Sequence, residues 1–211
     1  MSFLKPRSTE TTRDRLMTAA ELAILEKGFA ATSIEELIAE VGVSKGGFFY
    51  HFRDKSELVK AILARSLEAE ERWFDSMFAR AQAVTDDPLQ EFLTFLRFLR
   101  EDMERLPEVH PGCLITACCF QERLFEHDVH ELAKESLLKW RWQFHTRLIR
   151  IAQMYPPKVD VDLEHLADML TVLTDGGIIL SKTVREKDVL PHQVELYRAF
   201  VRAVFLGTSP A

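Results

Sequence analysis

The side chains best suited to bind a charged or polar ligand gather in residues 44–55. Donors that could serve such a ligand include Lys45, Tyr50, His51 and Lys55. Between them stand Gly46 and Gly47, which cost roughly 1 kcal/mol each against alanine if this segment is a helix. A sequence that departs from a local preference in this way is expected to gain something elsewhere. Two missing side chains would let a helix backbone come close to a base edge or a phosphate, so the segment predicts contact with nucleic acid.

The cysteine segment is a second candidate for chemistry. Cys113 follows Pro111-Gly112, where a helix is expected to begin, and a helix N-terminus lowers the pKa of a thiol. His110 is near enough in sequence to assist, and Cys118 or Cys119 could supply a resolving thiol. The alternative is that all three cysteines fill space in a packed helix, because unpaired cysteine is among the most buried residue types. The sequence favours this second interpretation and leaves the sensor open.

Metal binding and enzyme catalysis find little support. His110 with Cys113, and His127 with His130, are three residues apart, but no tight four-ligand cluster follows, so no metal and no cofactor are predicted. The chain lacks a Cys-x-x-Cys motif, a Gly-rich nucleotide loop and a Ser-centred elbow. We therefore do not expect an enzyme. A cysteine-dependent enzyme and a helical scaffold are the alternatives from other classes, and the scaffold does not explain Gly46-Gly47.

Charge is unevenly distributed along the chain. The 211 residues carry a formal net charge of −6, yet residues 1–55 hold eight Lys/Arg and eight Asp/Glu and are neutral. A small positive face on an acidic body is therefore possible, from Lys45, His51, Arg53 and Lys55. No apolar run approaches the ~20 residues needed to cross a bilayer, and no signal peptide is recognised. We expect a cytoplasmic protein with no membrane partner.

Hydrophobic residues recur at helical spacing almost throughout, and no run alternates long enough to predict a strand. The predicted fold class is all-α with about nine helices: residues 9–27, one after Thr32-Ser33, one from Ser44 to His51, one from Asp54 to about Ala83, one opening at Asp86-Asp87-Pro88, one after Pro111-Gly112, residues 128–155, residues 160–186, and a last one that follows Leu190-Pro191 and ends at Gly207. Gly176-Gly177 lies inside the eighth, where we expect close helix packing rather than a break.

Two short helices joined by Gly42 form the pattern of a helix-turn-helix, whose second helix enters the DNA major groove. Phe48 and Phe52 are expected to point inward from that second helix. The segment from Arg13 to Leu58 resembles the DNA-binding domain of the tetracycline-repressor (TetR) family. The matching motifs are Gly28-Phe29, Thr32-Ser33-Ile34, Gly42-Val43-Ser44-Lys45-Gly46, His51-Phe52 and Lys55-Ser56-Glu57-Leu58.

The resemblance implies a role for each matching position. Thr32 and Ser33 would cap their helix and contact phosphate, and Ser44 would cap the recognition helix. Lys45 would read bases, since lysine can reach guanine O6 and N7. Position 49, usually Tyr in this family, is Phe, and Tyr50 could replace the missing hydroxyl. The full predicted DNA-binding set is Thr32, Ser33, Ser44, Lys45, Gly46, Gly47, Phe49, Tyr50, His51 and Lys55, the last two on phosphates.

The resemblance also implies a helix-turn-helix domain over residues 1–55 and an effector-binding, dimerising domain over 56–211. Apolar spacing predicts a homodimer interface from Leu163, Leu166, Leu170, Leu173, Gly177, Tyr197, Val201 and Val204. An apolar effector pocket would draw on Phe74, Phe78, Phe95, Met103, Cys113, Phe120, Trp140 and Phe144.

The expected function is that of a repressor which a small apolar or aromatic effector releases from a pseudo-palindromic operator in double-stranded DNA. A thiol-based sensor that uses Cys113 is the alternative, because its Gly-Cys-Leu segment is similar to one in family members that sense electrophiles.

Overall fold

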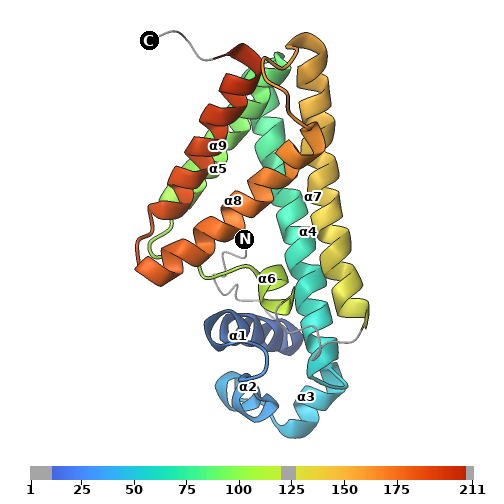
Figure 1. The fold of residues 1–211 in the computed structure, drawn as a ribbon. Helices are drawn as coiled ribbons and strands as arrows, with labels where there is room; N and C mark the ends of the chain where they lie inside the picture. Colours follow the sequence, from blue (N-terminus) through green and yellow to red (C-terminus); the bar gives the residue numbers. More distant parts are fainter. Residues whose placement is uncertain (1–10, 120–126, 208–211) are drawn as a thin grey trace. The chain divides into compact units, whose positions relative to one another are not determined.

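The computed structural model describes residues 11–119 and 127–207, and every regular element in this part of the chain is an α-helix. The helices are α1 (Thr12–Lys27), α2 (Ile34–Val41), α3 (Lys45–His51), α4 (Lys55–Gln82), α5 (Pro88–Glu104), α6 (Leu114–Cys119), α7 (His127–Met154), α8 (Leu163–Val184) and α9 (Val189–Leu206) (Figure 1). The predicted all-α class and its nine helices are confirmed within these residues.

The chain forms two compact units, and two long helices contribute to both. The N-terminal unit takes the described part of residues 1–72 and 111–136, and the C-terminal unit takes residues 73–110 and the described part of 137–211. The predicted boundary after residue 55 falls at the start of the long helix α4, and the two compact units divide later in the same helix, after Arg72. The reason is that Leu58, Val59 and Ile62 are buried, so the first turns of α4 belong to the core of the N-terminal unit.

Side-chain caps and glycines set the helices of the N-terminal unit. Thr11 and Asp14 form a capping box that starts α1 at Thr12, slightly after the predicted start. Ser33 caps α2 by accepting a hydrogen bond from the Glu36 backbone N–H. Gly42 ends α2 with φ +72°, a left-handed conformation that glycine adopts without strain, and so makes the turn between the two short helices.

In the C-terminal unit α9 packs against both α8 and α5 (Figure 1). Helix α8 is unbroken at Gly177, where a Cβ would lie 2.9 Å from Leu190 Cδ1 and 3.3 Å from Leu190 Cα, so the close approach expected there is confirmed. The Tyr197 hydroxyl donates to the Leu166 carbonyl at 2.8 Å and ties the two helices together.

The predicted dimer residues lie mostly inside this packing. Six of the eight are buried within the single chain: Leu166, Leu170, Gly177, Tyr197, Val201 and Val204. Their regular spacing therefore reflects the packing of α8 on α9 within one chain. Leu163 and Leu173 are partly exposed. More exposed apolar side chains lie elsewhere on the same two helices, such as Val172 on α8 and Leu196 on α9.

Five of the predicted effector-pocket residues form one aromatic cluster in the C-terminal unit. Phe78 and Phe95 stack with their ring centroids 3.9 Å apart. The other rings of the cluster surround Phe74, whose centroid lies 6.0 Å from Phe95, 5.9 Å from Trp140 and 5.7 Å from Phe144. Met103 is buried in the same unit, Cys113 belongs to the N-terminal unit, and Phe120 lies outside the described residues.

Candidate nucleic-acid interface

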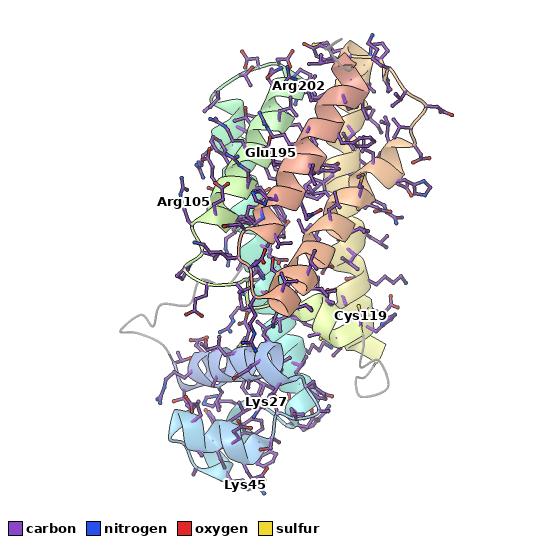
Figure 2. The ribbon with its side chains drawn as sticks, turned by 60° about the vertical axis from the view of Figure 1, so that its left-hand side comes forward. Lys27, Lys45, Arg105, Cys119, Glu195 and Arg202 are labelled. Atoms are coloured by element: carbon purple, nitrogen blue, oxygen red, sulfur yellow. The ribbon has the colours of Figure 1, made fainter. Side chains whose placement is uncertain are left out.

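Helix α3 begins with an exposed turn that carries the main predicted base-reading side chain. Ser44 is its N-cap, and the Ser44 Oγ accepts from the Gly47 backbone N–H at 3.1 Å. Lys45 follows as the first helical residue, and its side chain is 66% exposed. Figure 2 shows Lys45 at the outer edge of the N-terminal unit. Its ammonium lies 3.5 Å from Glu35 Oε1 on α2, so it already has an anionic neighbour.

The two glycines of α3 have room for side chains that they do not carry. A Cβ at Gly46 would meet nothing nearer than Ser44 Oγ at 3.9 Å, and a Cβ at Gly47 would make only ordinary contacts, the nearest 3.4 Å away. Neither residue has positive φ, so the backbone does not require glycine there. Nothing in the described protein offsets the loss of helix propensity, roughly 1 kcal/mol per glycine. The described part of the protein therefore gives no packing or backbone reason for glycine at either position.

The remaining residues of α3 divide cleanly between core and surface. Phe48 and Phe52, just after the helix, are fully buried and anchor it, as predicted. Phe49 is 46% exposed and Tyr50 is 85% exposed, while His51 is partly exposed beside the Tyr50 ring. The outward side of α3 therefore presents an apolar ring, a phenol and an imidazole next to Lys45 and the bare glycine backbone.

Thr32 does not present its hydroxyl to the surface. The side chain is 1% exposed, and Thr32 Oγ1 donates to the Gly28 carbonyl at 2.9 Å. The predicted phosphate contact of this hydroxyl is therefore corrected: Thr32 holds the turn between α1 and α2. Ser33, the N-cap of α2, is exposed and keeps its place in the candidate interface.

Lys55 is also occupied inside the N-terminal unit. Its ammonium donates to the carbonyls of Phe29 and Thr32 at 2.6 and 2.7 Å and lies 4.0 Å from the centroid of the Phe29 ring. Burial lowers the pKa of this lysine. Two of its three donors are used on backbone, so the expected phosphate contact is revised to a structural role: Lys55 fixes the turn that precedes Ser33.

Two further cations position the interface, and sequence patterns did not indicate them. Arg15 on α1 donates to the Val41 carbonyl at the end of α2. Arg65 on α4 donates to Glu21 Oε2 at 2.7 Å, and burial raises the pKa of that carboxyl against the lowering effect of the arginine. Both contacts join residues far apart in sequence, which no local spacing reveals.

The cysteine segment has the predicted local structure, and its three cysteines differ in exposure. Cys113 directly precedes α6, and its carbonyl accepts from the Ala117 N–H at 3.0 Å. Cys118 is buried, which raises the pKa of its thiol to about 12, whereas Cys119 is exposed. Burial also lowers the pKa of His110 to about 4, so this histidine is neutral near pH 7. A buried thiol of that pKa is a poor resolving group.

No three-residue group of His, Cys, Asp and Glu in the described ranges could hold a metal ion. Of the spaced pair His127 and His130, the side chain of His127 lies outside the described residues. Within the same ranges, no helix is both long and apolar enough to cross a bilayer.

Comparison with known proteins identifies the family. The family model described as bacterial regulatory proteins, tetR family, matches residues 16–62, which run from α1 into α4. Transcriptional regulator AcuR of Cereibacter sphaeroides is 30% identical over 174 residues, which cover 79% of this chain and 74% of that regulator. This chain belongs to the TetR family. An uncharacterized HTH-type transcriptional regulator in the lacX 3' region of Lactococcus lactis is 26% identical over 102 residues, so the match spans only 50% of that relative.

The match to solved structures extends well beyond the segment that the family model covers. The crystal structure of regulatory protein TetR from Rhodobacter sphaeroides matches with a TM-score of 0.75 over 90% of this chain and 98% of that one, at 20% identity. At this identity the likeness concerns the fold alone. The segment matched by the family model contains α2, the turn at Gly42 and α3, which together form the candidate nucleic-acid interface.

Proposed function

We propose that this TetR-family regulator binds operator DNA sequence-specifically and represses transcription, with α3 in the major groove. The observation that carries the proposal is the first turn of α3, where Gly46 and Gly47 leave the backbone bare although the protein has room for side chains. Lys45 stands at the same turn, exposed, with donors that suit guanine O6 and N7. The phosphates and sugars near Lys45 would be contacted by Ser33, Ser44, Tyr50 and His51.

A homodimer is the second part of the proposal. The outward sides of α8 and α9 expose large apolar side chains, which soluble monomers rarely gather. They are Val172, Ile179 and Leu180 on α8 and Leu196 and Phe200 on α9. Four helices packed across a two-fold axis would cover them, and a two-fold dimer reads half-sites about 10 base pairs, or a multiple of that, apart.

A small apolar or aromatic effector is the third part. The aromatic cluster around Phe74 and Phe78 is the proposed place for it. Two buried polar atoms of α7, Gln143 Oε1 and Arg147 Nε, have no hydrogen-bond partner among the described residues. The Arg147 guanidinium lies 3.5 Å from the centroid of the Phe78 ring, so this arginine adjoins the cluster. An effector with an aromatic body and one polar group would suit such surroundings.

The proposed activity is binding rather than catalysis. The proposed location is the bacterial cytoplasm, because the DNA lies there. The family and its relatives are regulators. A thiol sensor based on Cys113 is less favoured, because the buried Cys118 would resolve a disulfide poorly. Cys119 is the remaining partner for such chemistry.

The test is selection of binding sites from a pool of random DNA duplexes, followed by fluorescence anisotropy at a stated salt concentration. We expect a pseudo-palindromic consensus that the protein binds in the presence of excess random competitor. Lys45→Ala should lose this preference, whereas Lys139→Ala, which removes the same charge from an exposed position on α7, should keep it. Failure to enrich any sequence would contradict the proposal.

A further inference from the structure

An acidic side chain stands beside the proposed base-reading lysine. Glu35, in the first turn of α2, places Oε1 3.5 Å from the Lys45 ammonium, and both side chains are largely exposed. A hydrogen bond from its own backbone N–H and the lysine lower the pKa of this carboxyl, so it is ionised near neutral pH. An anion at this place repels DNA phosphates, which makes its presence in the interface a cost to affinity.

Glu35 and Glu36 both lie in the first turn of α2, where an acid favours the helix N-terminus, but the two carboxylates pair with different cations. Glu36 pairs with Lys27 at the end of α1 and so joins two helices of the scaffold. Glu35 instead pairs with a side chain of the proposed interface, and exposed pairs of this kind contribute little to folding. Its effect is therefore expected where Lys45 acts, on DNA.

We propose that Glu35 determines the DNA specificity of this regulator by holding Lys45 and penalising non-cognate sequences. An ammonium has three donors, so on the operator Lys45 can bind guanine O6 and N7 while it keeps Glu35. On other sequences the lysine finds no such acceptors. The carboxylate then repels the phosphates, and no hydrogen bonds from Lys45 to the bases offset this repulsion. Glu35 thus weakens non-specific binding more than operator binding, which raises the ratio of the two affinities. This inference rests on the proposed function.

The test compares Glu35→Gln with Glu40→Gln, which removes the same charge from another exposed position of α2. Each variant is titrated by fluorescence anisotropy with two probes, a duplex selected by the wild-type protein and a scrambled duplex of the same composition. For Glu35→Gln we expect scrambled DNA to bind about tenfold more tightly and selected DNA to change by about twofold or less, so that selectivity falls. Glu40→Gln should shift both affinities together. In a Lys45→Ala background, Glu35→Gln should leave the remaining selectivity unchanged.

Three results would overturn the inference. Equal effects of Glu35→Gln and Glu40→Gln would show that only the net charge of α2 matters. A Glu35→Gln variant with the selectivity of the wild type would show that Glu35 does not determine specificity. A full effect in the Lys45→Ala background would show that the pair does not act as a unit. All three leave the proposed function standing, which fails separately if the wild-type protein enriches no sequence. Circular dichroism of each variant confirms that the fold is retained.

Discussion

The Arg65 guanidinium on α4 lies 2.7 Å from the Glu21 carboxylate on α1, and its other terminal nitrogen lies 3.3 Å from Thr18 Oγ1. One arginine thus contacts successive turns of the helix that supports the helix-turn-helix. Glu21 is 3% exposed, so its charge depends on this partner.

Arg65→Met should destabilise the protein by about 3 kcal/mol at pH 7.5, because it leaves the Glu21 carboxylate buried without its partner. The loss should shrink at pH 5. Without Arg65 the already raised pKa of Glu21 rises further, so the folded state keeps a proton that the unfolded state releases, and stability falls as the pH rises through the folded pKa. Urea unfolding at both pH values measures this, and Arg72→Met, on an exposed pair with Glu68, is the control. Equal losses at both pH values would contradict the assignment.

Gly177→Ala should destabilise the C-terminal unit by about 1–3 kcal/mol, because the new Cβ would lie 2.9 Å from Leu190 Cδ1 and 3.3 Å from the Leu190 backbone. Gly176→Ala is the matched control, since a Cβ there meets nothing within 4 Å and should favour the helix. Denaturant unfolding of both variants at one protein concentration distinguishes them. If the two alanines had the same effect, the close approach of α8 to α9 at Gly177 would be refuted.

Lys55→Met should lower the free energy of unfolding by about 2 kcal/mol, because two carbonyls lose a charged donor. The dependence of DNA affinity on salt should remain as in the wild type, since we assign the ammonium to backbone rather than phosphate. A phosphate contact would instead reduce the slope of log K against log salt concentration by about 0.9. A reduced slope with unchanged stability would restore the phosphate role.

Cys119 should react with a maleimide in the folded protein, and Cys118 should not. The buried Cys118 thiol has a pKa raised to about 12, so at pH 8 it is almost entirely protonated as well as inaccessible. Peptide mass spectrometry after a short labelling pulse, with a sample in urea as the control, identifies the labelled residue. Rapid labelling of Cys118 in the folded state would show that α6 opens.

The sequence predicted the helix-turn-helix well because its signals are local. Ser33, Gly42 and Ser44 are caps and a turn whose roles depend on neighbours within four residues, and Phe48 and Phe52 follow helical spacing. The family resemblance implies phosphate contacts for Thr32 and Lys55, but a matching motif does not show which way a side chain points. In the folded chain both side chains donate to backbone carbonyls. The contact of Lys55 with the Thr32 carbonyl joins residues that are 23 positions apart in the sequence.

The predicted dimer residues show a different limit. Periodicity identifies an apolar face of a helix, and it does not distinguish packing within one chain from packing between two. Tyr197 and Val201 are buried within their own chain, whereas Val172 and Leu196, outside the predicted set, are exposed. The ion pair of Glu35 with Lys45 likewise depends on the angle between α2 and α3, and residue spacing does not reveal this angle.

The most direct test of DNA binding through α3 is Gly46→Ala, measured for both unfolding and DNA affinity. A Cβ at Gly46 meets only Ser44 Oγ at 3.9 Å, so the variant should be as stable as the wild type or more stable by up to about 1 kcal/mol. Its affinity for the duplex selected by the wild-type protein should fall at least about tenfold, because the new methyl group occupies space needed by the DNA. Unchanged affinity would contradict the account, since the glycines would then have no partner outside the protein.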